Sequence, residues 1–217
     1  ERWSGKAYDA TQAVSDDVIM ALCEAALWAP SCYGEAPWRY VICNKFKDEI
    51  SWQKTLDCLA PGNQEWAVNA PLLIVTASLP HFTHNGSENR WNGYDTGAAS
   101  LNLCLQSTAF GLMSHQMGGF DADKLRDALS IPTNVNLWSV IAIGYPAALD
   151  TFSAEALERE LKARQRRPLN EHFFERMKKL KKLNYHKNSF GLEMWSFKMK
   201  DFFNIALEYF VDDKRIQ

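Results

Sequence analysis

The sequence predicts a fold that combines helices with buried strands, and three segments carry this prediction. Residues 72–77 (LLIVTA) and 137–144 (LWSVIAIG) are short apolar runs bounded by turn signals, a pattern typical of strands buried on both faces. In residues 94–111 apolar side chains recur at helical spacing over a longer stretch. With 217 residues, 47% of them hydrophobic, the chain is long enough to bury a substantial core.

Composition and charge narrow the classes of function. The formal net charge is −2, so no overall basic field favours a nucleic-acid partner. No apolar run reaches the roughly 18 residues of a membrane span, so a membrane partner is not expected. The five cysteines are an odd number without a C-x-x-C pair, which argues against a metal site and a disulfide framework and favours a reducing, cytoplasmic setting.

The N-terminal segment carries polar side chains on alternate residues. In an extended chain alternate side chains share a face, so Arg2, Ser4 and Lys6 can converge on one anion. The alternative is a solvated, fraying terminus.

A first helix is predicted from Ser15, a capping residue followed by two acids that complement the helix dipole. Pro30 and Pro37 then bracket a loop of small residues before a strand over residues 38–43. Such a loop is either the lip of a cofactor site or an ordinary helix-to-strand connection. The predicted buried face of the helix consists of Val18, Leu22, Ala25, Ala26 and Ala29.

The polar residues 44–54 predict a surface helix, and turn chemistry follows over residues 58–63. Asn63 either caps a short helix or offers its amide to a ligand. His81 and His84 stand in a polar loop without a third ligand, so they are expected to face solvent rather than a metal.

Residues 94–111 are expected to form the central core helix, with Gly111 as its C-terminal cap, followed by a strand over residues 112–117. His115 in that strand is expected to be a structural histidine rather than an acid or base. Gly118 and Gly119 suit a place where backbone approaches a ligand, and Asp121 is placed to cap a helix over residues 122–129. The predicted buried stripe of the core helix is Ala98, Leu101, Leu105, Thr108, Ala109 and Leu112.

A polar helix is expected over residues 153–163, and three arginines follow it at positions 164, 166 and 167. They form a solvated face, a partner-binding patch, or a phosphate site that uses the bidentate geometry of guanidinium. The chain has neither G-x-G-x-x-G nor G-x-x-x-x-G-K-[ST], so a phosphate would not be held by a Rossmann or Walker loop.

Taken together, these motifs resemble the flavin-dependent nitroreductase family over residues 2–169. The resemblance rests on the shared order and spacing of short motifs rather than on any one of them. They are R-W-S-x-K-x-Y from Arg2, A-P-S from Ala29, P-W-R from Pro37, N-x-x-W from Asn63, D-x-G-A-A from Asp95, G-G-F-D from Gly118, G-Y-P from Gly144, and R-x-R-R-P-L from Arg164.

The resemblance implies an α+β domain with a central, mainly antiparallel sheet surrounded by helices, in an intertwined homodimer that binds FMN at its interface. Arg2 and Ser4 would contact the FMN phosphate, joined by Arg164 and Arg166 of the partner subunit. Lys6 and Asn63 would face the pyrimidine edge of the flavin, and the Gly118 amide would lie near N5. The FMN-binding residues it implies are Arg2, Trp3, Ser4, Lys6, Pro30, Ser31, Cys32, Asn63, Gln116, Met117, Gly118, Gly119, Arg164 and Arg166.

The implied activity is an NAD(P)H-dependent FMN oxidoreductase that reduces nitroaromatic, quinone or similar conjugated acceptors by a ping-pong mechanism. No catalytic side chain is required, and Lys6 is the candidate to stabilise charge on the reduced flavin. Two alternatives stay open. One keeps the fold but changes the flavin chemistry to dehalogenation, desaturation or flavin fragmentation, and the other is a flavin-binding partner protein with little turnover.

Two departures from the family pattern motivate those alternatives. Where the family often has N-x-Q-P-W, this chain has Gly34, Glu35 and Ala36 before Pro37, so two amides are missing and an acid is present. Beyond the FMN-binding domain, residues 1–169, a C-terminal extension over residues 170–217 carries a basic run and an aromatic amphipathic stripe. We expect this extension to be helical and packed on the dimer.

Overall fold

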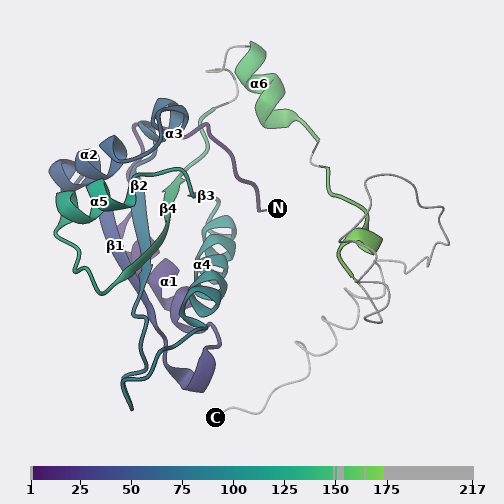
Figure 1. The fold of residues 1–217 in the computed structure, drawn as a ribbon. Coiled ribbons are helices and arrows are strands. Elements are labelled where there is room, and N and C mark those ends of the chain that lie inside the picture. The colour runs from purple at the N-terminus through teal and green to yellow at the C-terminus, as the bar shows by residue number, and fades with distance from the viewer. Residues whose placement is uncertain (1, 149, 151–153, 164, 174–217) are drawn as a thin grey trace, which may run out of the picture. The chain divides into compact units, whose positions relative to one another are not determined.

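The computed structural model describes residues 2–148, 150, 154–163 and 165–173 (Figure 1). The chain divides into two compact units, residues 1–163 and 164–217, which are described separately below. The aromatic stripe of the C-terminal extension and Arg164 both lie outside the described residues. The proposed division at residue 169 therefore stays a prediction.

Four antiparallel strands form the sheet of the first unit. They are β1 (Trp38–Asn44), β2 (Leu72–Ser78), β3 (Met113–Met117) and β4 (Asn136–Gly144), in the order β1-β2-β4-β3. Val75 of β2 pairs with Val41 on one side and Val140 on the other, and every residue of β2 is buried. The prediction of an α+β fold with an antiparallel sheet is confirmed.

Helices cover both faces of the sheet (Figure 1). On one face, α1 (Asp16–Leu27) and α4 (Asn92–Ala109) enclose a core that includes Leu22 and Leu103. On the other, α2 (Glu49–Asp57), α3 (Pro61–Ala67) and α5 (Ala122–Leu129) enclose a second core around Trp52 and Leu125. Alternate residues of β2 enter the two cores, which is why its sequence is apolar throughout.

The predicted caps Ser15, Asp121 and Gly111 are confirmed. Ser15 Oγ accepts a hydrogen bond from the Val18 amide at the start of α1, and Asp121 Oδ1 accepts one from Lys124 at the start of α5. After α4, Gly111 has a φ of 73°, and the Leu112 amide donates to the Ser107 carbonyl 2.9 Å away. That left-handed residue and backward bond satisfy carbonyls that the helix leaves unpaired.

The prediction of a surface helix over residues 44–54 is wrong in two respects. Asn44 ends β1, and α2 begins only after Asp48, whose carboxylate caps the helix by accepting from the Ser51 amide. The helix also buries Trp52 and Leu56 against the sheet. Most of the residues of α2 are polar, so the sequence pattern does not reveal that Trp52 and Leu56 form a buried apolar face.

The predicted buried stripe of α4 is also wrong. Leu101 and Leu105 are 47% and 50% exposed, Ala109 is exposed, and Ala98 and Thr108 are half-buried. Of the predicted stripe only Leu112, beyond the helix end, is buried. The helix instead packs on α1 and the sheet through small and mid-sized residues, namely Asp95, Thr96, Ala99, Ser100, Leu103, Cys104 and Ser107.

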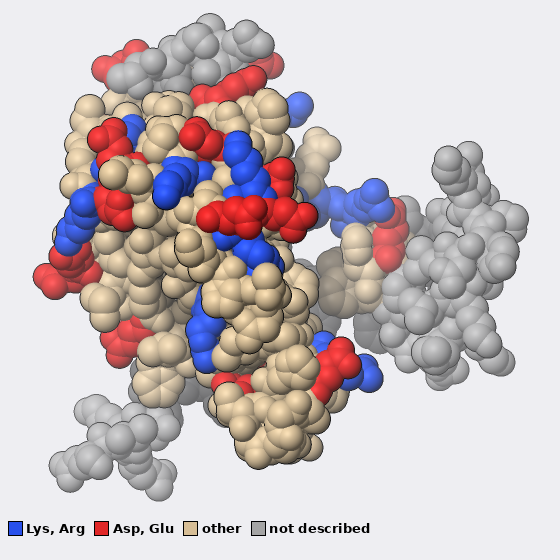
Figure 2. Space-filling model, turned by 60° about the vertical axis from the view of Figure 1, so that its left-hand side comes forward, with Lys and Arg blue, Asp and Glu red and all other residues tan. Residues whose placement is uncertain are grey.

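Three further elements are η1 (Cys32–Gly34), α6 (Ala154–Leu161) and η3 (Leu169–Glu171). Figure 2 shows basic and acidic side chains interspersed over one face of the protein. Among the described residues, no helix is long and apolar enough to cross a membrane, and no three His, Cys, Asp or Glu side chains are grouped to hold a metal ion.

Candidate functional site

The N-terminal segment brings two of its predicted phosphate ligands together. Arg2 Nη1 donates to Ser4 Oγ over 3.0 Å, and both residues are half-buried. Their guanidinium and hydroxyl groups are donors suited to phosphate oxygens. The structure thus brings Arg2 and Ser4 into contact, while the convergence of both with Lys6 on one anion stays a prediction.

Lys6 lies on the same segment, beside an aromatic cluster. Its Nζ is 5.6 Å from the centre of the Trp66 ring, which stacks with the Tyr8 ring at 6.1 Å and lies 4.6 Å from the His115 ring. Ring faces attract a cation, so this cluster helps to fix the position of the ammonium group.

His115 has a structural contact, in agreement with the sequence prediction. Its Nδ1 lies 3.1 Å from the Gly5 carbonyl, an acceptor, so Nδ1 carries the proton. The pKa of His115 is lowered chiefly because burial desolvates the charged imidazolium. The nearby positive charge of Lys6 lowers it further. The imidazole is thus neutral at pH 7, and it anchors the N-terminal segment to β3.

Asn63 and Gly119 are 56 residues apart in the sequence and in contact in the fold. Asn63 lies inside α3, whose N-cap is Ala60, so it is not the cap that one interpretation suggested. Its Nδ2 donates to the Gly119 carbonyl over 3.0 Å, and the Ala60 amide donates to the same oxygen over 2.9 Å. A Cβ on Gly119 would lie 3.0 Å from Asn63 Nδ2, so a side chain there would have to displace the Asn63 amide.

The other residues at the end of β3 differ in their exposure to solvent. Gly118 is exposed, and a Cβ built on it would meet nothing within 4 Å, so its backbone borders open space. Gln116 is exposed, with its Nε2 3.5 Å from Cys104 Sγ. Met117 is 2% exposed and belongs to the core, which leaves only its backbone available to a ligand.

The loop between Pro30 and Pro37 is hydrogen-bonded to α4. The Cys32 amide donates to Asp95 Oδ2 over 3.0 Å, and Asp95 is 4% exposed in the first turn of that helix. The Ser31 hydroxyl accepts from the Ala36 amide over 2.9 Å. Tyr33 and Ala36 have positive φ values of 55° and 48°, a strained backbone that these bonds maintain. Sequence reasoning assigned no role to Asp95, although it stands in a quoted motif.

Glu35 faces a neighbouring hairpin. Its side chain is 6% exposed, its Oε1 accepts from the Thr83 amide over 2.9 Å, and its Oε2 lies 3.7 Å from His84 Nδ1. The hydrogen bond from Thr83 is the main cause that lowers the pKa of Glu35, and His84 adds to it. His81 and His84 are exposed, as predicted.

The site residues of the first unit fall into two groups. The N-terminal segment and the end of β3 lie at one end of α4, and η1 with Ser31 and Cys32 lies at the other end (Figure 1). Arg166 is exposed in the second unit and donates to the Gln165 carbonyl.

The first group fits a flavin mononucleotide. Arg2 and Ser4 supply cationic and hydroxyl donors for a phosphate, and Asn63 and the glycine backbone supply amide groups for a flat heterocycle. The open space beside Gly118 leaves room for a ring to approach the main chain. Redox cofactors need little more from a protein than such binding and orientation.

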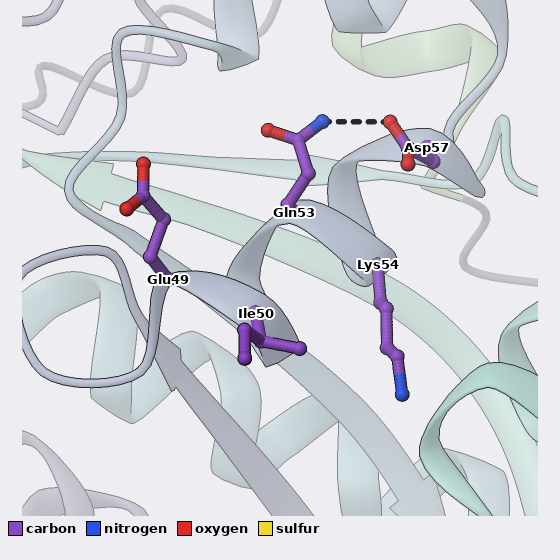
Figure 3. Close-up of a pocket in the computed structure, with 5 residues that line it drawn as sticks. All are labelled: Glu49, Ile50, Gln53, Lys54 and Asp57. Carbon is purple, nitrogen blue, oxygen red and sulfur yellow. Dashed lines mark hydrogen bonds between the residues drawn. The ribbon is translucent and has the colours of Figure 1, made fainter.

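A shallow hollow elsewhere on the surface has no part in this site. It is lined by one face of α2, where Gln53 Nε2 donates to Asp57 Oδ1 over 2.7 Å (Figure 3). Glu49, Ile50 and Lys54 complete its lining, and none of the predicted site residues borders it.

Known proteins resemble this chain in sequence. An Archaeoglobus fulgidus protein whose name gives the activities NADH dehydrogenase and NAD(P)H nitroreductase is 28% identical over 158 residues, 68% of this chain and 87% of that protein. A Thermus thermophilus protein named NADH dehydrogenase is 26% identical over 165 residues, 62% of this chain and 78% of its relative.

Solved structures resemble it in fold. One, described as an oxidoreductase containing FMN, is 32% identical, with a TM-score of 0.73 over 80% of this chain and 87% of that one. Another, a Streptococcus pneumoniae nitroreductase family protein, has a TM-score of 0.63 at 20% identity and covers 81% of this chain and 96% of its own. The sequence pattern of the Nitroreductase family matches residues 1–145. The chain therefore belongs to the Nitroreductase family.

Proposed function

We propose that this protein is an FMN-dependent oxidoreductase that uses NAD(P)H to reduce nitroaromatic, quinone or similar conjugated acceptors. The two substrates would occupy one pocket in turn, a ping-pong mechanism. Family membership supports the reaction class, and the FMN in the 32% identical structure supports the cofactor. The names of the sequence relatives support NAD(P)H as the electron donor.

One contact carries the proposal, the hydrogen bond from Asn63 Nδ2 to the Gly119 carbonyl. It places an amide predicted for the pyrimidine edge beside the glycine backbone predicted for N5, although the two come from different elements. A flat ring that met both would be oriented by fixed amide groups on one edge.

Bound FMN would supply the hydride chemistry itself. The task of the chain is to bind and orient, with Arg2 and Ser4 on the phosphate and the Gly118 amide as a donor near N5. Lys6 would stabilise negative charge on the reduced ring, because a fixed cation near developing charge lowers the barrier to its formation.

We further propose that the working unit is a homodimer. The two groups of site residues lie at opposite ends of α4 within one chain, so Ser31 and Cys32 of one copy, predicted to bind FMN, would complete the site of the other. Leu101 and Leu105, one helical turn apart on α4, are 47% and 50% exposed and offer an apolar surface for a second copy.

A different flavin chemistry is motivated less by the structure than by the sequence. That alternative depended on Glu35 as an acid at the site. The Glu35 carboxylate instead binds the Thr83 amide and faces His84, so its presence is explained by the attachment of a hairpin.

The test is the visible absorption spectrum of the purified protein, recorded before and after NADPH is added without oxygen. We expect an oxidised-flavin spectrum that bleaches, followed by its return when a quinone or nitro compound is added. A colourless protein that takes up no added FMN would refute the proposal. A flavin that bleaches but passes no electrons to either acceptor would favour the alternative chemistry.

A further inference from the structure

We propose that Glu160, a residue of α6 outside the predicted flavin site, is the positioning residue that holds residues 3–6 in place for cofactor binding. The inference rests on the proposed function, because Arg2, Ser4 and Lys6 are the residues whose positions it would fix. It assigns a role to α6, which has no other part in the site.

The Glu160 carboxylate accepts two hydrogen bonds from the N-terminal segment. The Trp3 indole donates to Oε2 over 3.1 Å, and the Lys6 amide donates to Oε1 over 3.0 Å. Each carboxylate oxygen thus accepts a hydrogen bond from a different donor, and the two donor residues are three positions apart in the sequence. Two bonds to an ionised acceptor fix both the position and the direction of the chain between them.

Gly5, one of the two residues between these donors, is closely surrounded. A Cβ on Gly5 would lie 2.5 Å from Met113 Sδ and 3.0 Å from Glu160 Oε2 and Trp3 Cδ1. Contacts under 3.0 Å force a shift of the neighbour. The segment therefore runs in close contact with both β3 and the Glu160 carboxylate, and a side chain on Gly5 would have to displace Met113.

Opposite Glu160, the segment is held by His115, whose Nδ1 proton reaches the Gly5 carbonyl. The segment is thus bound from two sides, by an acceptor on α6 and a donor on β3. The charged and titratable groups near the carboxylate are Lys6, His115 and Tyr8. These bonds fix the main chain from which the Arg2, Ser4 and Lys6 side chains extend.

The test compares Glu160→Ala with Glu158→Ala, which removes an exposed carboxylate from the same helix. Hydrogen exchange of the Lys6 amide is measured in flavin-free full-length protein, and FMN affinity is measured by fluorescence titration. For Glu160→Ala we expect about tenfold faster exchange and about tenfold weaker FMN binding, because hydrogen bonds to a charged group are lost. Glu158→Ala should match the wild type in both.

Two further readouts separate positioning from general destabilisation. Glu160→Gln keeps one acceptor oxygen and should fall between the wild type and Glu160→Ala. The midpoint potential of the bound flavin should become more negative in Glu160→Ala, because Lys6 is no longer held beside the reduced ring. Slow hydrogen exchange of the β2 amides in a variant establishes that its core is folded. If Glu160→Ala fails to fold, the exchange rate and FMN affinity of Glu160→Gln test the inference instead.

Unchanged Lys6 exchange, or unchanged FMN affinity despite faster exchange, would overturn the inference. Failure of the proposed function looks different, because the wild type itself would then bind no FMN. Lys6 exchange would still reveal whether Glu160 holds the segment.

Discussion

At the scale of single residues, the candidate site is organised by groups that bind the main chain. Asp95 holds the Cys32 amide, His115 holds the Gly5 carbonyl, and Asn63 holds the Gly119 carbonyl. Asp95 and His115 thus place backbone donors and acceptors without using the side chains that a cofactor would meet. Lys6 is the cationic side chain to which we assign a direct part in the reaction.

Replacing Lys6 by Ala should therefore slow reduction of the bound flavin by about 10- to 100-fold while FMN affinity changes by less than about fivefold. In the proposed function the cation would act mainly on the charge of the reduced ring, whereas binding would be shared with Arg2, Ser4 and Asn63. Anaerobic stopped-flow absorbance with NADPH measures the rate, and Lys54→Ala on the exposed face of α2 is the control. Equal rates in the Lys6→Ala and wild-type proteins would remove the role.

Glu35 should make the free energy of unfolding depend on pH in the acid range. Its pKa is lowered in the folded state, so near its ordinary pKa the unfolded chain binds more protons, and folding is favoured as pH rises. That stabilisation is present above the unfolded-state pKa and is lost as pH falls through the lower, folded-state value. Glu35→Gln should show a shallower loss of stability below about pH 4.5.

Urea unfolding at a series of pH values measures this slope. Glu65→Gln, an exposed residue of α3, should retain the wild-type profile. If the acid limb of Glu35→Gln is as steep as that of the wild type, the carboxylate does not couple the hairpin to the loop.

At the scale of elements, the end of β3 is docked onto the start of α3. The Gly119 carbonyl accepts from Ala60 and Asn63, and the Asp121 amide donates to the Cys58 carbonyl. The two adjacent glycines therefore have different surroundings: Gly119 packs against α3, whereas Gly118 borders open space.

Gly119→Ala should therefore destabilise the protein by about 1–3 kcal/mol, because the new Cβ displaces the Asn63 amide and crowds Ala60. Gly118→Ala is the matched control and should stay within about 0.5 kcal/mol of the wild type. Urea denaturation gives both values. Equal stability of the two variants would contradict the docking described here, and FMN affinity should fall more in Gly119→Ala.

At the scale of the whole molecule, α4 links the two groups of site residues and leaves an apolar stripe exposed. In the first unit nothing described covers Leu101 or Leu105. Burying such side chains against a second copy gains about 25 cal/mol for each Å² of apolar surface removed from water. A homodimer accounts for both the stripe and the separation of the site residues.

Leu105→Glu should disrupt that dimer, since a carboxylate would be buried without a partner. We expect a monomer in analytical ultracentrifugation at micromolar concentration and loss of bound FMN. Ile50→Glu, a change of the same kind at a 72% exposed position on α2, should leave the oligomer and the flavin content unchanged. A dimeric Leu105→Glu protein that keeps its flavin would place the interface elsewhere.

The sequence by itself determined the buried strands, the helices capped by Ser15 and Asp121, the left-handed end of α4, and the family. These properties depend on local signals: the apolar run of β2, the capping oxygens of Ser15 and Asp121, and the left-handed Gly111 after α4. The order of short motifs also predicted a site that includes Arg2, Ser4, Asn63 and Gly119, and the fold brings Arg2 to Ser4 and Asn63 to Gly119.

Only the tertiary structure decided which faces are buried and which distant groups meet. α4 carries two stripes that suit burial, and the sequence favoured the larger side chains, which the fold leaves exposed while smaller ones contact α1. Periodicity reports that a face is apolar, but not whether its partner is the same chain. Glu160 and Asp95 were overlooked for a related reason: each acts on a backbone amide far away in the sequence, and such a contact leaves no pattern in the residues around it.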